Sequence, residues 1–310
     1  MPDLPTVTVI VPVHNGVATI RTCVEALLAQ DWPREALELI VVDNRSTDAT
    51  QAVVAEYPVR LLEEDRVQSS YAARNRGVAA SHGDLLAFTD ADCVPDPGWV
   101  RALAAALEDH RVGLAAGPIE AWRADRLVER YQAARALRAE RAVRHPVLPF
   151  AQTANAACPR VVFDAVGGFD AACAFGGDLD FCWRVQRRTG LRLAYEPAAV
   201  VRHRHRTTWH GLFALYQKNA LANCLLAERW AHYAAYPSLR TAAFLGREVV
   251  RSGWRVLVTG PAGRGDPGRA PLPEMVRWAG ELSGWLRWRF GAVPARRRPP
   301  CAPRRAETPA

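Results

Sequence analysis

The sequence predicts an α/β fold, in which a mostly parallel sheet with flanking helices is followed by a C-terminal helical region. Within the first 120 residues, short continuous apolar runs alternate with segments of helical periodicity. This alternation is typical of strands that are buried on both faces and joined by helices. After residue 206 only helical periodicity recurs, and a Gly/Pro-rich stretch interrupts it at 261–273.

Four strands are expected before residue 90, at 7–12, 37–42, 59–62 and 85–89. The helices expected between them cover 17–30, the stretch from the cap Ser46-Thr47-Asp48 to about Tyr57, and 69–81. From 110 to 205 we expect a strand near 112–120, a helical stretch at 124–141, irregular chain at 145–160, a helix at 178–189 and a strand near 191–201.

Length and charge divide the chain into a domain and an appendage. The 310 residues suit one large domain with an additional region, and the net charge of +8 is unevenly spread. Residues 1–200 hold 21 basic and 26 acidic side chains, whereas residues 201–310 hold 19 and 6. We therefore expect an α/β domain over 1–210, a basic amphipathic helical region over 211–291, and a disordered basic tail over 292–310.

Cysteine usage and hydropathy exclude several classes of protein. The seven cysteines are odd in number and form no C-x-x-C pair, which argues against a zinc site and fits a reduced, cytoplasmic setting. The N-terminus shows no charged region followed by a long apolar stretch, so no secretory signal is expected. No run of about 18 apolar residues predicts a membrane-spanning helix.

Polar residues follow three of the predicted strands. They are His14-Asn15, Asp43-Asn44 and Asp90-Ala91-Asp92. Because ligands of open α/β sheets bind at the carboxyl ends of the strands, we expect these three clusters to meet in one cleft. Two carboxylates at i and i+2 suit Mg²⁺ or Mn²⁺, with diphosphate oxygens completing the coordination shell. A D-x-D triplet is also common in solvated loops.

Two further clusters lie in the second half of the domain. Asp178 and Asp180 stand where a helix begins, either as caps or, for one of them, as a general base for an alcohol. His203, His205 and His210 follow the strand near 191–201, and a strand would place the first two on one face, suited to a metal or a phosphate.

Five motifs in register resemble family 2 glycosyltransferases of the GT-A fold. They are VTVIVPVHN, LELIVVDNRSTDAT, AARNRGVAASHGDLLAFTDADC, VGGFD and FGGDLDFCWRV, and the resemblance covers about residues 6–206. It implies an inverting transfer from a nucleotide-diphosphate sugar donor, with a divalent metal.

The resemblance also implies roles for individual residues. It places Pro12, His14, Asn15 and Arg74 at the nucleotide pocket, Asp43 at the base or ribose, Asp90 and Asp92 in the D-x-D motif, Asp92 and His203 on the metal, and Asp178 as the catalytic base. Two departures stand out. Gly177 replaces the glutamate expected before Asp178, which puts the acceptor class and even activity in question, and the Gln-x-x-Arg-Trp motif of processive synthases is absent. Addition of a single sugar is therefore favoured.

The C-terminal region has amphipathic periodicity. Residues 238–258 align nine apolar or small residues along one stripe and four arginines on the opposite side, and 275–290 repeat the pattern with tryptophans. Such helices suit peripheral contact with the cytoplasmic face of an anionic membrane, or they pack on the catalytic domain and leave the arginines in solvent. No nucleic-acid module accompanies the charge, so nucleic acid is not expected as a partner.

The leading hypothesis is a glycosyltransferase that acts on a hydroxyl acceptor, in cell-envelope or lipid-linked glycan synthesis. The alternative is a catalytically silent sugar-nucleotide-binding protein of the same fold, because Gly177 removes a carboxylate from the motif. A sugar-phosphate nucleotidylyltransferase would need a Gly-rich, basic phosphate loop near the N-terminus, which residues 11–16 do not supply.

Overall fold

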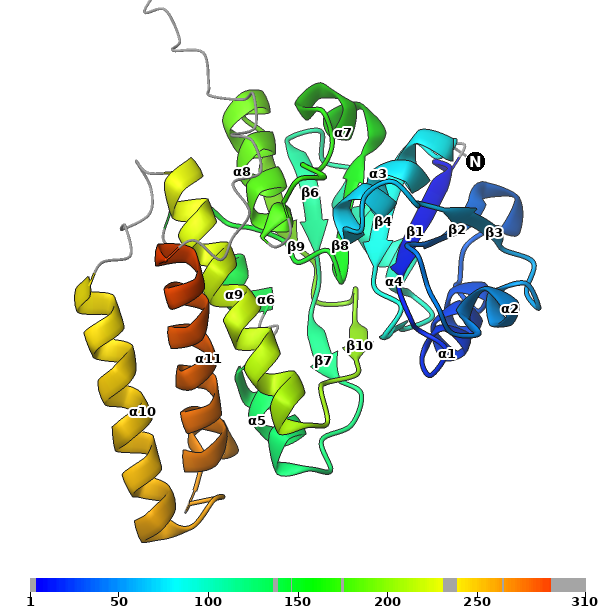
Figure 1. Ribbon diagram of the computed structural model, residues 1–310. Helices are drawn as coiled ribbons and strands as arrows, with labels where there is room; N and C mark the ends of the chain where they lie inside the picture. Colours follow the sequence, from blue (N-terminus) through cyan, green and yellow to red (C-terminus); the bar gives the residue numbers. More distant parts are fainter. Residues whose placement is uncertain are drawn as a thin grey trace, which may run out of the picture.

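The computed structural model describes residues 4–135, 139–145, 147–173, 176–230, 239–263 and 265–290. Its centre is a seven-stranded sheet in the order β3-β2-β1-β4-β8-β6-β9 (Figure 1). These strands are β1 (Val7–Val13), β2 (Leu37–Asp43), β3 (Arg60–Glu63), β4 (Leu85–Thr89), β6 (Val112–Ala116), β8 (Asn155–Pro159) and β9 (Arg192–Tyr195). The mixed α/β architecture with a mostly parallel sheet is as the sequence predicts.

Helices cover both faces of the sheet. They are α1 (Ile20–Leu28), α2 (Thr50–Val54), α3 (Ser70–Ala80), α4 (Trp99–Ala106), α5 (Leu127–Arg135), α6 (Ala139–Ala142), α7 (Arg160–Val166) and α8 (Gly177–Thr189), with a 3₁₀ turn at Arg34–Ala36. Alternate residues of β1 serve the two faces. Val9 and Val11 pack with α1 and α4, whereas Ile10 packs with α3, α7 and α8. A strand buried on both faces is mostly apolar, which explains the run at 7–13, and its one polar side chain, Thr8, donates to Glu38.

Parallel pairing aligns the first strand ends. In the register of β1 with β2, Val13 lies opposite Asp43, and in that of β1 with β4, Ile10 lies opposite Phe88. The residues that follow the three strands therefore emerge at the same edge of the sheet, as expected.

The expectation of irregular chain at 145–160 is wrong in its last six residues, because a strand covers 155–159 and a helix begins at Arg160. Asn155–Pro159 form β8, which pairs antiparallel with both β4 and β6 in the middle of the sheet. Its sequence, NAACP, lacks the β-branched and aromatic residues that mark strands, and the partners on either side compensate for that low propensity. The adjoining helix α7 was also not anticipated.

Two expected strands each divide between two sheets. The segment near 112–120 forms β6 and β7 (Ile119–Ala121), and that near 191–201 forms β9 and β10 (Val201–His203). Strands β7 and β10 join β5 (Cys93–Pro95) in a small sheet of order β5-β10-β7. In it His203 lies opposite Cys93, directly after the D-x-D triplet.

Three long helices close the chain: α9 (Trp209–Arg229), α10 (Leu239–Thr259) and α11 (Pro271–Arg289), with a 3₁₀ turn at Pro267–Arg269. Figure 1 shows α11 between α9 and α10, with α10 outermost. Glycine permits the close approach of α11 to α9, because a Cβ on Gly280 would lie 2.6 Å from the Phe213 carbonyl oxygen. None of the described helices combines the length and apolar character that crossing a membrane requires. The expected tail at 292–310 lies outside the described residues.

The expected arrangement of α10, with one apolar stripe packing or binding and arginines opposite, needs correction. The half that packs on α11 buries Leu245, Glu248 and Ser252. Much of the apolar stripe instead faces solvent, on the same half of the helix as Arg247 and Arg251.

A buried carboxylate joins three helices. Asp180 in α8 is fully buried and accepts from Arg184 Nε at 2.8 Å, while Arg229 Nε at the end of α9 lies 2.9 Å away. Arg184 also donates to the carbonyls of Val166 and Gly168 at the end of α7. The Asp180 group therefore fixes the ends of α7 and α9 to α8.

Replacing Asp180 with alanine should lower the free energy of unfolding by about 3–5 kcal/mol, because two arginines lose their buried partner. Urea denaturation measures the change. Asp164→Ala, at an exposed position of α7, is the control and should leave the midpoint nearly unchanged. An unchanged midpoint for Asp180→Ala would show that this ion-pair group does not stabilise the fold.

Candidate active site

The loops after β1 and β2 are held together by polar contacts. The backbone N–H of Asn15 donates to Ser46 Oγ at 2.8 Å, and its side-chain oxygen accepts from the Thr47 N–H at 2.7 Å. His14 Nδ1 lies 3.0 Å from the Asn44 carbonyl oxygen, which places the ring proton on Nδ1 and leaves Nε2 as an acceptor. Both side chains are exposed at the edge of the sheet, directly after Pro12 and Val13 of β1.

Asp43 has one carboxylate oxygen in use and one free. Its Oδ2 accepts from the Ser46 N–H at 3.1 Å and from Gln51 Nε2 at 3.0 Å. Its Oδ1 is buried and has no hydrogen-bond partner among the described residues. A buried acceptor of this kind normally has a donor, so Oδ1 is suited to an N–H or O–H of a ligand.

Asp90 is paired with a buried arginine. Arg74 in α3 is 2% exposed, and its guanidinium forms an ion pair with Asp90 Oδ1. The Asp90 side chain remains 34% exposed, so one side of the pair faces the site. The pairing leaves Asp90 with little charge to offer a cation and fixes its second oxygen in place.

Asp92, Cys93 and His203 form the one group of metal-binding type found in the described part of the chain, with their ligand atoms within 4.8 Å of one another. His203 Nε2 lies 3.5 Å from Asp92 Oδ1. Burial raises the pKa of the Asp92 carboxyl, and His203 opposes this rise. A carboxylate and an imidazole fit a divalent cation, whereas the thiol of Cys93 is a softer ligand than Mg²⁺ prefers.

His205 packs against His203. The two rings have centroids 5.3 Å apart. Burial lowers the pKa of His205 to about 4, and His203 adds to this, so the ring is neutral near pH 7. His210 lies exposed in the first turn of α9.

Asp178 begins α8 and faces α3. Its Oδ1 accepts from the Leu179 N–H at 2.9 Å and from the Tyr71 hydroxyl at 3.4 Å. Burial raises the pKa of Asp178, Arg74 counteracts this rise, and Asp90 adds to it. Tyr71 also packs against Arg74, whose guanidinium carbon lies 5.7 Å from the centre of the Tyr71 ring, so Asp178 lies near the Arg74–Asp90 pair. Asp180, by contrast, is turned into the protein interior.

The Tyr71 ring occupies the space that a side chain at position 177 would need. A Cβ at Gly177 would lie 2.8 Å from Cε2 of Tyr71, closer than real Cβ atoms approach. The Tyr71 ring therefore fills the space in which a larger residue 177 would begin. Tyr71 is not among the site residues expected from the sequence, although it stands directly before the AARNRG segment. Cys93, which directly follows the D-x-D triplet, is also not among them.

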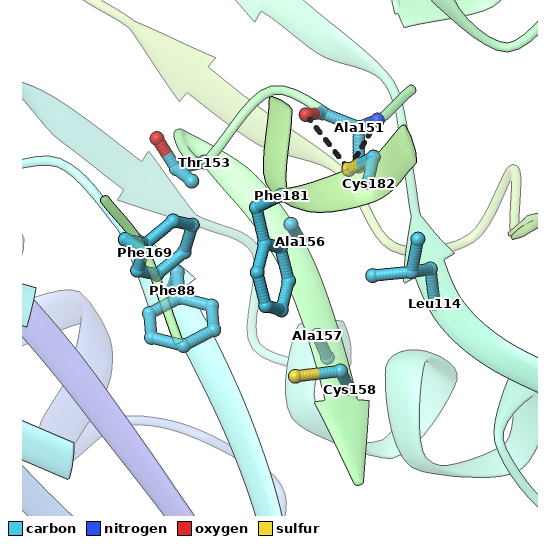
Figure 2. Close-up of a pocket in the computed structure, with 10 residues that line it drawn as sticks. All are labelled: Phe88, Leu114, Ala151, Thr153, Ala156, Ala157, Cys158, Phe169, Phe181 and Cys182. Atoms are coloured by element: carbon cyan, nitrogen blue, oxygen red, sulfur yellow. Dashed lines mark hydrogen bonds between the residues drawn. The ribbon is translucent and has the colours of Figure 1, made fainter. Parts of the chain in front are cut away.

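A small apolar pocket lies behind this site, between the sheet and α8. Figure 2 shows Phe88, Phe169 and Phe181 around it, with Cys182 hydrogen-bonded to the backbone of Ala151. Burial raises the pKa of Cys182 to about 12, so its thiol is uncharged. These residues belong to the core that packs α8 on the sheet, and none of the expected site residues lines the pocket.

Sequence comparison relates the chain to known enzymes. The profile described as Glycosyl transferase family 2 matches residues 8–167. The pre-mycofactocin glycosyltransferase of Mycobacterium tuberculosis is 34% identical over 210 residues, which cover 65% of this chain and 43% of the relative. Glycosyltransferase AglE of Haloferax volcanii is 38% identical over 122 residues, which cover 38% of this chain and 40% of the relative. The chain spans less than half the length of these curated relatives.

Solved structures share the fold. The mannosyltransferase PcManGT of Pyrobaculum calidifontis, in complex with GDP-Man and Mn²⁺, has a TM-score of 0.65 at 22% identity, over 93% of this chain and 88% of that chain. Glucosyl-3-phosphoglycerate synthase of Mycobacterium tuberculosis, in complex with Mn²⁺, UDP and phosphoglyceric acid, has a TM-score of 0.54 at 22% identity, over 72% and 78%. The family profile matches more than half of this chain, and the chain shares the fold of these solved structures. It therefore belongs to glycosyl transferase family 2.

Proposed function

We propose that the protein is an inverting glycosyltransferase that moves a single sugar from a nucleotide-diphosphate sugar to a hydroxyl acceptor. The observation that carries this proposal is the hydrogen bond from Tyr71 to Asp178 beside the Arg74–Asp90 pair, at the edge of the sheet where Asp92 and His203 also lie. Family membership supports the reaction class, and two structures of the same fold were solved with Mn²⁺ and a nucleotide or nucleotide sugar.

The donor would lie across the carboxyl ends of β1, β2 and β4. Pro12, His14 and Asn15 would line the nucleotide, and the free Oδ1 of Asp43 would accept a hydrogen bond from the base or the ribose. The Arg74–Asp90 pair would face the sugar and diphosphate, where the second Asp90 oxygen is available to a sugar hydroxyl.

Asp92 and His203 would hold a divalent cation, Mg²⁺ or Mn²⁺. Their burial and their 3.5 Å separation fit this role, and the Nδ1 of His203 is buried without a partner among the described residues. When bound, such a cation supplies positive charge to the diphosphate oxygens of the leaving nucleotide. Cys93 lies close enough to influence which metal is preferred.

Asp178 would act as the general base. The acceptor hydroxyl attacks the anomeric carbon from the face opposite the diphosphate, and its proton passes to an Asp178 carboxylate oxygen. The bond from that carbon to the diphosphate oxygen breaks, the nucleoside diphosphate leaves, and the configuration at the carbon inverts. The carboxylate must be ionised for this role. Arg74 and the Tyr71 hydroxyl favour that ionised form against the effect of burial.

We place the acceptor in cell-envelope or lipid-linked glycan synthesis, at the cytoplasmic face of a membrane, with residues 238–290 in peripheral contact with it. The basic, amphipathic character of that region supports this location. Competition between a lipid-linked and a water-soluble hydroxyl acceptor, presented with the same donor, tests the acceptor class.

The alternative, a silent sugar-nucleotide-binding protein, rests on the missing glutamate at position 177. Tyr71 packs against Gly177 and donates a hydrogen bond to Asp178. This contact favours an active enzyme in which Tyr71 takes the place of the glutamate side chain, over a protein that has lost its activity. Release of nucleoside diphosphate from a panel of sugar nucleotides and acceptors separates the two. Binding without any release would favour the silent protein.

Asp178→Asn should leave donor affinity nearly unchanged and lower kcat by about 10²-fold or more, because the amide cannot accept the acceptor proton. Initial rates and calorimetric donor affinity are the two measurements. Asp164→Asn, which removes an exposed carboxylate from α7, is the matched control. Turnover of Asp178→Asn at the normal rate would remove Asp178 from the base role.

Asp92→Ala should abolish the part of donor affinity that depends on Mn²⁺, because a principal ligand is lost. Titration calorimetry of nucleoside diphosphates with and without Mn²⁺ measures this. The affinity without metal should change little. Equal Mn²⁺ dependence in Asp92→Ala and the parent protein would contradict the proposed cation site.

Tyr71→Phe should shift the acid limb of the kcat/KM profile to higher pH. The base works ionised, so activity falls as the pH drops through its pKa, which burial already raises. Without the Tyr71 hydroxyl the ionised form loses a donor, and the pKa of Asp178 rises further. Tyr57→Phe, at the Arg21–Glu25 surface contact, is the control. An unshifted limb would mean that Tyr71 serves packing alone.

A further inference from the structure

We propose that the solvent-facing half of α10 is a docking surface for an anionic lipid bilayer. This surface, the outer face of α10, consists of Val250, Trp254, Leu257 and Val258 with Arg240, Arg247 and Arg251, whereas Phe244 at its margin packs on Trp278 of α11. The proposal does not depend on the transfer reaction, because binding to vesicles is measured without donor or acceptor.

The apolar side chains of the outer face are unusually exposed. Val250 is 73% exposed, Trp254 67%, Leu257 80% and Val258 64%. Single exposed apolar residues are ordinary, but these four recur at i, i+4, i+7 and i+8 and so form one strip along the helix. A strip of this kind costs free energy in water, which indicates that it is covered when the protein is in its working environment.

The rest of the described chain does not cover this strip. Leu245, Glu248 and Ser252 on the opposite half of α10 are buried against α11, and α11 is itself packed on α9. Figure 1 shows α10 at the outer side of the three helices, away from the central sheet. The outer face is thus available to a large, flat partner.

Charge identifies that partner as anionic. Arg240 and Arg247 are exposed beside the strip, and the sole acidic residue of α10, Glu248, lies on the buried half, where it forms an ion pair with the exposed Arg251. Arginines flanking Trp and aliphatic residues match a membrane surface, where acyl chains receive the apolar groups and anionic headgroups the guanidinium groups. Two-fold pairing with a second copy would bring these arginines together, so the charge disfavours self-association.

The dimensions of the helix fit this placement. Its 21 residues extend over about 30 Å, so the strip can lie in the plane of the headgroups along several turns. The apolar side chains would then reach about 5–10 Å into the boundary between headgroups and acyl chains.

Flotation of the full chain with lipid vesicles tests the inference. The protein should float with vesicles of phosphatidylcholine mixed with phosphatidylglycerol, far less with phosphatidylcholine alone, and less as salt is added. The double variant Trp254→Ser/Leu257→Ser should bind at least about tenfold more weakly. Val161→Ser is the control, because Val161 is 74% exposed on α7 and lies outside the outer face.

A second pair of variants tests the charge. Arg240→Gln/Arg247→Gln should weaken binding to the anionic vesicles about tenfold, and Arg130→Gln/Arg141→Gln, which removes two exposed charges elsewhere, should not. Urea midpoints close to the parent protein show that all variants are folded. Failure of the folded parent protein to float, or equal flotation of Trp254→Ser/Leu257→Ser, would overturn the inference. Conversion from a dimer to a monomer by that variant, without vesicle binding in the parent, would assign the face to self-association instead.

Discussion

The parallel pairing of β1 with β2 and β4 is the constraint on which the site depends. Because these strands run side by side in one direction, the polar residues after each of them emerge at one edge of the sheet. Burial on both faces favours apolar residues within the strands, so the polar side chains that can bind a ligand lie at the strand ends. The antiparallel strand β8 connects β4 to β6 and β9 in the sheet, and the small sheet adds His203 from a distant part of the sequence.

Three of the carboxylates at this edge each have a different partner. Asp90 pairs with Arg74, Asp92 lies beside His203, and Asp178 meets the Tyr71 hydroxyl. Because each carboxylate has its own partner, the three differ in net charge and in proton affinity. One of them can therefore bind a cation while another accepts a proton. Asp180, by contrast, is buried and joins α7, α8 and α9 through its ion pairs with Arg184 and Arg229. Because Asp178 and Asp180 lie in the same first turn of α8, the ion pairs of Asp180 also fix the position of Asp178.

The sequence predicted those elements whose residue pattern has one physical explanation. Continuous apolar runs predicted β1, β2 and β4, and strand-end carboxylates predicted the edge at which they meet. It failed where packing overrides propensity, as in the alanine-rich β8, and where a contact joins distant residues. The hydrogen bond between Tyr71 and Asp178 spans 107 positions, and the division of α10 into a packed and an exposed half depends on where α11 lies.

The most direct test of the donor site is a crystal structure with Mn²⁺ and a nucleoside diphosphate, read through anomalous scattering at the manganese edge. The account predicts one strong peak between the Asp92 carboxylate and His203 Nε2, with the diphosphate beside it and the base near Asp43. A peak elsewhere, or a nucleotide bound away from the carboxyl ends of β1, β2 and β4, would contradict it.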